Sequence, residues 1–225
     1  MNMKAIFENA RKIGCLSFST FESNNIHARI ARFFGYDDEG LYFLTMTSKP
    51  FYRQLVGSGK LAVCGIFPSG AVFAEDENGM PLMQPGFTLR ITGDVRQISQ
   101  EAVREKAESD HAGFKFALYD ISRYPAARVF CLYRGKGEIF DYDFEMQNRD
   151  HKLHRTRFAF GGEHYNHAGC RITEVCNRCG ACMEICTFKA IMAGNPYTII
   201  GERCDECGSC MPACPEGAII EPETM

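Results

Sequence analysis

Residues 176–191 read CNRCGACMEICTFKAI, and residues 204–219 read CDECGSCMPACPEGAI. The two segments align without a gap, and each presents four cysteines in the spacing C-x2-C-x2-C-x3-C. Cubane iron–sulfur clusters need four thiolates each, and in chains with two such runs the fourth cysteine of a run ligates the other cluster. The repeat therefore predicts two [4Fe–4S] clusters within a small α+β module.

The cross-ligation rule divides the eight cysteines into two sets. The first set is Cys176, Cys179, Cys182 and Cys214, and the second set is Cys204, Cys207, Cys210 and Cys186. Gly180 and Gly208 occupy the same place in each run and allow the backbone to approach a cluster closely. Pro215 follows one fourth cysteine, whereas Thr187 follows the other. Because Thr can donate a hydrogen bond that Pro cannot, we expect an unusual potential at the cluster held by Cys186.

Two other roles for the cysteines fit the pattern less well. A structural zinc site usually takes two separated C-x2-C pairs, whereas each run here places three cysteines two residues apart. A disulfide scaffold suits a small secreted chain, and the N-terminal MNMKAIFENARKIG lacks the apolar region of a signal peptide. The spacing favours iron–sulfur clusters over both.

Over residues 171–221 the sequence resembles bacterial-type two-cluster ferredoxin domains. The resemblance rests on both cysteine runs, on their glycines and on the Ala-Ile pairs at 190–191 and 218–219. It implies single-electron transfer and a redox partner protein that donates or accepts electrons.

Composition narrows the class of protein. The chain has 225 residues, 45% of them hydrophobic, which allows one large or two modest domains. Its net charge is −3, but residues 171–225 hold four Lys and Arg against eight Asp and Glu. An acidic module argues against nucleic acid and suits docking on a basic partner, although solubility alone would also explain it. We expect a cytoplasmic protein without a membrane span, from an anaerobic or low-oxygen cell.

The first 146 residues carry the pattern of an antiparallel sheet with short helices. Alternating apolar residues favour strands at 14–20, 26–34, 40–46, 60–67 and 87–98, and a hairpin at 128–142 that turns at Gly135-Lys136-Gly137. Helices are expected at 3–12 and 99–109, and a third after Ser48, which is suited to be its N-cap. The predicted class is α+β, with an antiparallel β-barrel.

The order of motifs in this region is similar to the pyridoxamine 5′-phosphate oxidase-like, FMN-binding split-barrel family. The similarity rests on Arg29, GLYFLTMTSKPFYRQL at 40–55, LAV at 61–63 and LRITG at 89–93. It implies a split barrel that binds FMN, and a homodimer with FMN at the interface between protomers. This chain differs in having Thr88 where the family often has Trp, and in a long loop at 68–86.

The resemblance implies a set of FMN-binding residues. They are Arg29, Ile30, Ala31, Leu44, Thr45, Ser48 and Lys49. A hydroxyl, an ammonium group and free backbone N–H groups at a helix start suit a phosphate, as does the fork of an arginine. The alternative is that Ser48 is only a cap, Lys49 is solvated and Arg29 is a charge on the barrel face.

A basic, histidine-rich linker is expected between the two domains, at 147–170, which places the second domain at 171–225. Its charged residues are Arg149, His151, Lys152, His154, Arg155, Arg157, His164 and His167. They form either a solvated linker or an arm that contacts the acidic module or an anionic ligand. Cys15, Cys64 and Cys131 lie in apolar runs and are expected in the core, and Cys170 is given no role.

Together these features predict a flavo-iron–sulfur oxidoreductase. Electrons would pass singly through two clusters to or from FMN, which would reduce a small-molecule substrate. Alternatives are a flavin–ferredoxin electron carrier without its own substrate, a redox sensor, or a barrel that holds haem or a deazaflavin. No residue is assigned as catalytic, since Tyr52 and His27 are only weak candidates for a proton donor.

Overall fold

The computed structural model describes residues 1–68, 74–75, 77–79, 81–82, 86–108, 112–142, 153–165 and 168–222. The chain divides into two compact units. The first, here the sheet unit, is Met1–Ile66, Leu89–Gly137 and Phe158–His164. The second, here the cysteine unit, is Phe67–Thr88, Glu138–Arg157 and Tyr165–Met225.

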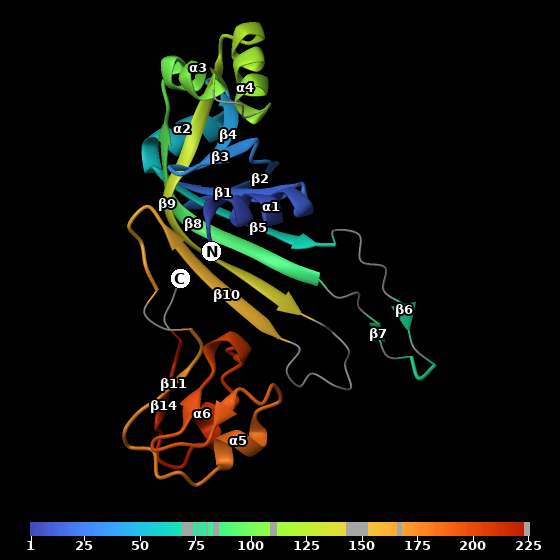
Figure 1. Cartoon of the computed structure of the whole chain (residues 1–225), viewed down its shortest axis with the longest axis vertical. Coiled ribbons are helices and arrows are strands. Elements are labelled where there is room, and N and C mark those ends of the chain that lie inside the picture. The colour runs from blue at the N-terminus through green and yellow to red at the C-terminus, as the bar shows by residue number, and fades with distance from the viewer. Residues whose placement is uncertain are drawn as a thin grey trace. The chain divides into compact units, whose positions relative to one another are not determined.

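An eight-stranded sheet dominates the first part of the chain. Its strands are β1 (Leu16–Glu22), β2 (Asn25–Ala31), β3 (Gly35–Asp37), β4 (Gly40–Met46), β5 (Lys60–Phe67), β8 (Gly86–Gln97), β9 (Ala127–Tyr142) and β10 (His154–Phe160). Seven of them follow the order β2-β1-β5-β8-β9-β4-β3, with β10 paired to β9, and Figure 1 shows β8 and β9 running side by side. The neighbours β1–β2, β1–β5, β3–β4 and β4–β9 are antiparallel. The α+β class is confirmed, and the sheet path among the described residues does not close into a barrel.

Helices α1 (Met3–Ile13), α2 (Pro50–Ser58), α3 (Gln100–Glu108) and α4 (Ala112–Arg123) accompany the sheet. Helix α1 starts where Asn2 Oδ1 accepts a hydrogen bond from Ala5 N at 2.9 Å. It ends at Gly14, whose φ of 81° lies in the region that glycine adopts at low cost. The face formed by Ile6, Phe7 and Ala10 is buried, as the sequence predicts.

Aromatic side chains fill the core of the sheet unit. In β1, Phe18 is fully buried and contacts Phe33, Phe43 and Phe51 with ring centroids 5.0, 5.2 and 6.4 Å apart. Because side chains alternate along a strand, the same strand turns Phe21 to the opposite, exposed face. This exposed face belongs to the pocket described below.

The predicted hairpin at 128–142 is wrong, because these residues form the single strand β9. Its two glycines do not turn the chain. A Cβ on Gly135 would lie 2.7 Å from Thr92 O, and a Cβ on Gly137 would lie 2.7 Å from Arg90 O. Both glycines therefore allow β9 to approach β8 closely. Glycine inside a strand often marks such a close approach of another backbone.

Helix α4 was not predicted. It buries Phe114, Ala117 and Ile121, which follow the spacing of one helix face, and the Phe114 ring lies 4.8 Å from that of Tyr42. The expectation for the single cysteines was only partly right. Cys131 is buried, but Cys15 and Cys64 are exposed, since Cys64 points away from the face that buries Leu61 and Val63.

Short elements make up the cysteine unit. They are β6 (Ala74–Glu75), β7 (Pro81–Leu82), β11 (Arg171–Ile172), α5 (Ala181–Ile185), β12 (Ile191–Met192), β13 (Thr198–Ile199), the 3-10 turn η1 (Gly201–Arg203), α6 (Cys210–Ala213) and β14 (Ile219–Ile220). Strand β11 pairs with β14, and β12 pairs with β13. The predicted linker segment 147–170 contains part of β10, and its residues Arg149, His151, Lys152 and His167 lie outside the described residues. No helix in the described part of the chain has the length and apolar character to cross a bilayer.

Candidate functional site

The first cysteine set surrounds a small cavity in the cysteine unit. Its lining includes all four predicted ligands, Cys176, Cys179, Cys182 and Cys214, together with Ile172, Asn177, Gly180, Tyr197, Ala218 and Ile219. The pKa of the Cys182 thiol is raised, first by burial and then by the charges of Cys176 and Cys214. The cysteine from the second run thus lies with the three from the first, in the arrangement that cross-ligation requires.

The second set is brought together in the same way. The pKa of the Cys210 thiol is raised by burial, and next by Cys204, with Cys207 and Cys186 contributing as well. Burial and the neighbouring cysteines thus disfavour the thiolate of Cys210 until a cation shares it. The donor set therefore fits a positively charged group with four sulfur ligands.

Backbone N–H groups also point at the sulfurs in a symmetric way. Ala190 N donates to Cys186 Sγ, and Ala218 N donates to Cys214 Sγ, each at 3.3 Å. Hydrogen bonds of this kind help to set the potential of a cluster. Among the described residues, no three His, Cys, Asp or Glu side chains surround a position for a single metal ion. In a cubane each thiolate binds a different iron, so that arrangement is not expected here.

A buried group of four charges lies against the loop of the second set. We call Glu138, Arg155, Arg157 and Glu206 the ion quartet. Arg155 Nη1 lies 2.6 Å from Glu138 Oε1 and 3.3 Å from Glu206 Oε2. Arg157 Nε lies 3.1 Å from Glu138 Oε2, and its Nη2 contacts Glu206 Oε1. Each carboxylate is thus shared by both guanidinium groups.

The ion quartet was not predicted from the sequence, although the sequence contains features that point to it. Glu138 lies near the end of β9, directly before Ile139 and Phe140, and is 2% exposed. Arg155 and Arg157 are two residues apart in β10 and so share one face of the strand. What the sequence could not show is that this face meets Glu206, in the loop between Cys204 and Cys207.

Cys170 also lies beside the second set. It is 1% exposed and packs in the same core as Cys204 and Cys210. Burial raises the pKa of the Cys170 thiol, and the two neighbouring cysteines raise it further.

Arg29, the first of the predicted FMN residues, points from β2 towards α2 in the sheet unit. Its Nη1 donates to Thr20 Oγ1 at 2.8 Å and to Phe18 O at 3.2 Å, and its Nη2 donates to Gln54 Oε1 at 2.7 Å. The guanidinium carbon lies 4.3 Å from the centre of the Phe51 ring. Burial lowers the pKa of Arg29, and no carboxylate of the described chain forms an ion pair with it. Three of its five donors are used, so two remain for an anion.

Ser48 and Lys49 precede α2 and are exposed. The N-cap is Lys49 rather than Ser48 as expected, and no side chain caps the helix. Its first residue, Pro50, has no N–H, and Tyr52 N donates to Lys49 O at 3.1 Å, so the first turn offers few free N–H groups. No hydrogen bond or ion pair holds either side chain within the described residues. Because α2 carries Phe51 and Gln54, both contacts of Arg29, the arginine lies close to this helix start.

The other predicted FMN residues occupy two separate strands. Ile30 and Ala31 lie on β2, where Ile30 is 68% exposed and Ala31 is half-buried. Leu44 and Thr45 lie on β4, and Thr45 is 3% exposed. Helix α2 packs against both β1 and β4, which brings these strands into one region. No comparison or contact tests these assignments, and they stay predictions.

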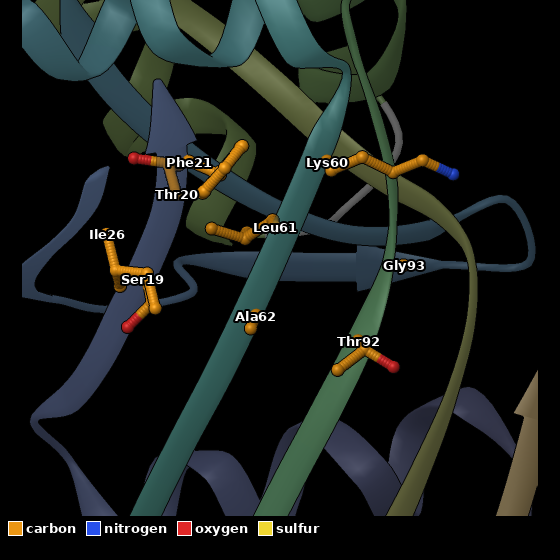
Figure 2. A pocket seen from close by; sticks show the side chains of 9 residues that line it. All are labelled: Ser19, Thr20, Phe21, Ile26, Lys60, Leu61, Ala62, Thr92 and Gly93. Carbon is orange, nitrogen blue, oxygen red and sulfur yellow. The ribbon is translucent and has the colours of Figure 1, made fainter. Parts of the chain in front are cut away.

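A pocket of about 540 Å³ lies on the exposed face of the same unit. Figure 2 shows it over β1, β5 and β8, which run side by side. Its lining residues are Ser19, Thr20, Phe21, Ile26, Lys60, Leu61, Ala62, Thr92 and Gly93. Phe21 and Ile26 are 53% and 78% exposed, so an apolar surface adjoins the strand that carries Arg29.

Comparison with known proteins identifies the iron–sulfur part. The model of the family described as a 4Fe-4S dicluster domain matches residues 175–219. No curated protein sequence matches the chain.

Solved structures similar to this chain include three from bacteria. A NimC/NimA family protein from Clostridium acetobutylicum has 16% identity and a TM-score of 0.49, covering 71% of this chain and 92% of its own. PhzG from Burkholderia lata has 16% identity and a TM-score of 0.44, covering 72% and 84%. A pyridoxamine 5′-phosphate oxidase-related, FMN-binding protein from Nostoc punctiforme has 14% identity and a TM-score of 0.40, covering 70% and 93%. With TM-scores below 0.5, these likenesses add nothing to the argument from the residues.

Proposed function

We propose that the protein is a flavo-iron–sulfur oxidoreductase that exchanges single electrons with a redox partner protein and reduces a small molecule at FMN. The observation that carries the proposal is the gathering of eight cysteines into two sets of four, in a chain that also holds an open cationic helix start. Two clusters supply single-electron transfer, and a flavin converts single electrons into two-electron chemistry.

The cysteine unit supports two clusters rather than one. Each set combines three closely spaced thiols with one from the opposite run, and each fourth sulfur accepts a backbone N–H. The chain's part is to hold eight sulfurs at fixed positions and to exclude water on the side of Ala190 and Ala218, which are buried. A cluster needs both properties to change charge without a large rearrangement.

The sheet unit supports an anionic cofactor such as FMN. Within the described part of the chain, Arg29 is a partly buried cation without a carboxylate partner, which is unfavourable unless an anion joins it. Ser48 and Lys49, just before α2, offer a hydroxyl and an ammonium group as further donors to a phosphate. Arg29 would fix the phosphate from the strand side, and Lys49 would hold it from the solvent side.

The exposed face of β2 supports a homodimer. Ile26 and Ile30 are 78% and 68% exposed on one face of the strand, with Phe21 on the neighbouring β1. A second copy of the chain that covered this face would bury apolar surface and close the pocket. Such a dimer would place Ile30 at the interface, where FMN is expected from the resemblance.

Anaerobic purification of the full chain tests the cofactors. We expect about eight irons and one FMN per chain. A protein with eight irons that carries no flavin and does not bind added FMN would overturn the flavin part alone, while a protein with bound zinc would overturn the cluster part.

Turnover separates an enzyme from an electron carrier. The reduced protein is mixed with small acceptors such as quinones, enones and nitro compounds, in the presence of a one-electron donor. Multiple turnovers with one acceptor class support the oxidoreductase. Reoxidation only by partner proteins identifies the carrier instead.

A further inference from the structure

The two cluster loops of the internal repeat have unequal surroundings. Arg178 and Glu206 are equivalent in the repeat and adopt similar backbone conformations, with φ of 64° and 60°. Arg178 is exposed, whereas the side chain of Glu206 is 16% exposed and is held by the ion quartet. The two loops, which are equivalent in the repeat, therefore differ in the side chains that pack against them.

Arg155 contacts the second loop directly. Its Nε donates to Cys204 O at 3.2 Å and its Nη2 donates to Asp205 O at 3.3 Å, while its side chain is 5% exposed. A buried cation acts through a low effective dielectric constant, and an exposed charge such as Arg178 is screened by water. Since Glu138 and Glu206 balance the charges of the two arginines, Arg155 acts on the second loop mainly through its hydrogen bonds to Cys204 O and Asp205 O, whereas Arg178 is exposed.

A hydroxyl group also lies beside the second set. Cys207 Sγ donates to Ser209 Oγ at 3.4 Å, a contact in which the hydroxyl would become the donor once Cys207 ligates iron as a thiolate, and the equivalent residue in the first run is Ala181. Cys170 packs in the same core as Cys204 and Cys210. Reduction adds negative charge to the sulfurs, so cations and hydrogen-bond donors favour the reduced form and raise the potential.

We propose that Arg155 and Ser209 make the second cluster the one with the higher reduction potential, with the ion quartet positioning Arg155 on the Cys204 loop. The inference rests on both cysteine sets holding clusters, as proposed above, and not on the flavin. Arg155 is a positioning and tuning residue, since it touches the backbone of a ligand rather than the reacting atoms. Glu138 and Glu206 keep two guanidinium groups buried at a tolerable cost.

The test is a redox titration of the full chain, followed by electron paramagnetic resonance. The paired variant Glu138→Gln with Arg155→Gln removes the guanidinium donors to Cys204 O and Asp205 O. Because it removes one charge of each sign, it leaves no buried charge without a partner. We expect the reduction equilibrium of the higher-potential cluster to fall about tenfold, which is about 59 mV for one electron. The lower-potential cluster should not move.

A reciprocal pair of variants serves as the matched control. Ser209→Ala should lower only the higher potential, and Ala181→Ser should raise only the lower one. Glu206→Gln, which removes an anion from the second loop, should raise the higher potential, whereas Arg178→Gln should affect the lower one and by less. These single changes decide the question if the paired variant loses its second cluster.

The proposal is overturned if the Ser209 and Glu206 variants shift the lower potential, shift both potentials equally or shift neither. Iron content distinguishes this failure from that of the proposed function. Fewer than eight irons in the unaltered protein would contradict the two-cluster assignment itself. Eight irons with unresponsive potentials would contradict only the role given to Arg155 and Ser209.

Discussion

The sheet unit and the cysteine unit are built on different sources of stability. The sheet unit buries large aromatic side chains such as Phe18, Phe43 and Phe114, each at most 1% exposed. The core of the cysteine unit is made largely of cysteines and small apolar residues around strands of two residues. Hydrophobic burial can hold the first unit, while the second has too little apolar volume to fold firmly without ligation.

This difference predicts that the two units are destabilised by different changes. Loss of iron should disorder the cysteine unit and spare the sheet. Loss of an aromatic ring should destabilise the sheet and spare the iron.

Removal of iron should have the largest effect. Chelation of the bound iron under reducing conditions should make residues 171–222 sensitive to protease, because thiol ligation supplies most of the folding free energy of so small a core. Limited proteolysis with mass spectrometry would locate the cuts. Protection of 171–222 after complete iron loss would show that the cysteine unit folds without ligation. Added iron and sulfide should restore resistance to protease.

Phe43→Ala is the reciprocal experiment. The ring lies between Phe18, Phe51 and Phe130, so its removal should cost about 3–5 kcal/mol in the free energy of unfolding of the sheet unit. Urea unfolding followed by tyrosine fluorescence measures the cost, and iron content should stay unchanged. Phe116→Ala, at a side chain that is 58% exposed, should change stability by less than about 0.5 kcal/mol.

Lys49→Ala addresses the cofactor of the sheet unit. Loss of the ammonium group at the start of α2 should weaken FMN binding about tenfold, which is about 1.4 kcal/mol. Titration of the flavin-free chain with FMN measures the change. Lys60→Ala is the matched control, because Lys60 is already ion-paired with Asp94. Equal losses from the two variants would show that Lys49 acts only through net charge.

The smallest effect concerns Cys131, which is fully buried in the sheet unit. Burial raises the pKa of its thiol to about 12, from the ordinary 9.0. Below pH 9 the thiol is protonated in both states, but between these values only the unfolded chain releases the proton, so stability falls as pH rises. Urea unfolding at several pH values should give a shallower fall for Cys131→Ala. Exposed Cys64→Ala should keep the original slope.

Local patterns carried most of what could be predicted. The cysteine spacing was sufficient to predict the two sets, because each set is built from short segments of one repeat. Strands β2, β4, β5 and β8 were predicted from alternation, with ends within a few residues. The spacing of Phe114, Ala117 and Ile121 could also have predicted α4.

Features that depend on distant pairings could not be predicted. Gly135 and Gly137 suggested a turn, because a glycine that lets two strands approach looks the same in a sequence as one that bends the chain. The partners of Arg155 are separated from it by 17 residues in one direction and by about 50 in the other. Only the folded chain shows that these charges meet.

The ion quartet has a consequence for how the iron–sulfur part could be moved between proteins. The match to the dicluster family runs from 175 to 219, but three members of the quartet, Glu138, Arg155 and Arg157, lie upstream of it. A recombinant fragment that began at residue 171 would expose Glu206 without its counter-ions. The transferable segment of this chain therefore begins near residue 138, and a graft cut at the first cysteine would leave part of the site behind.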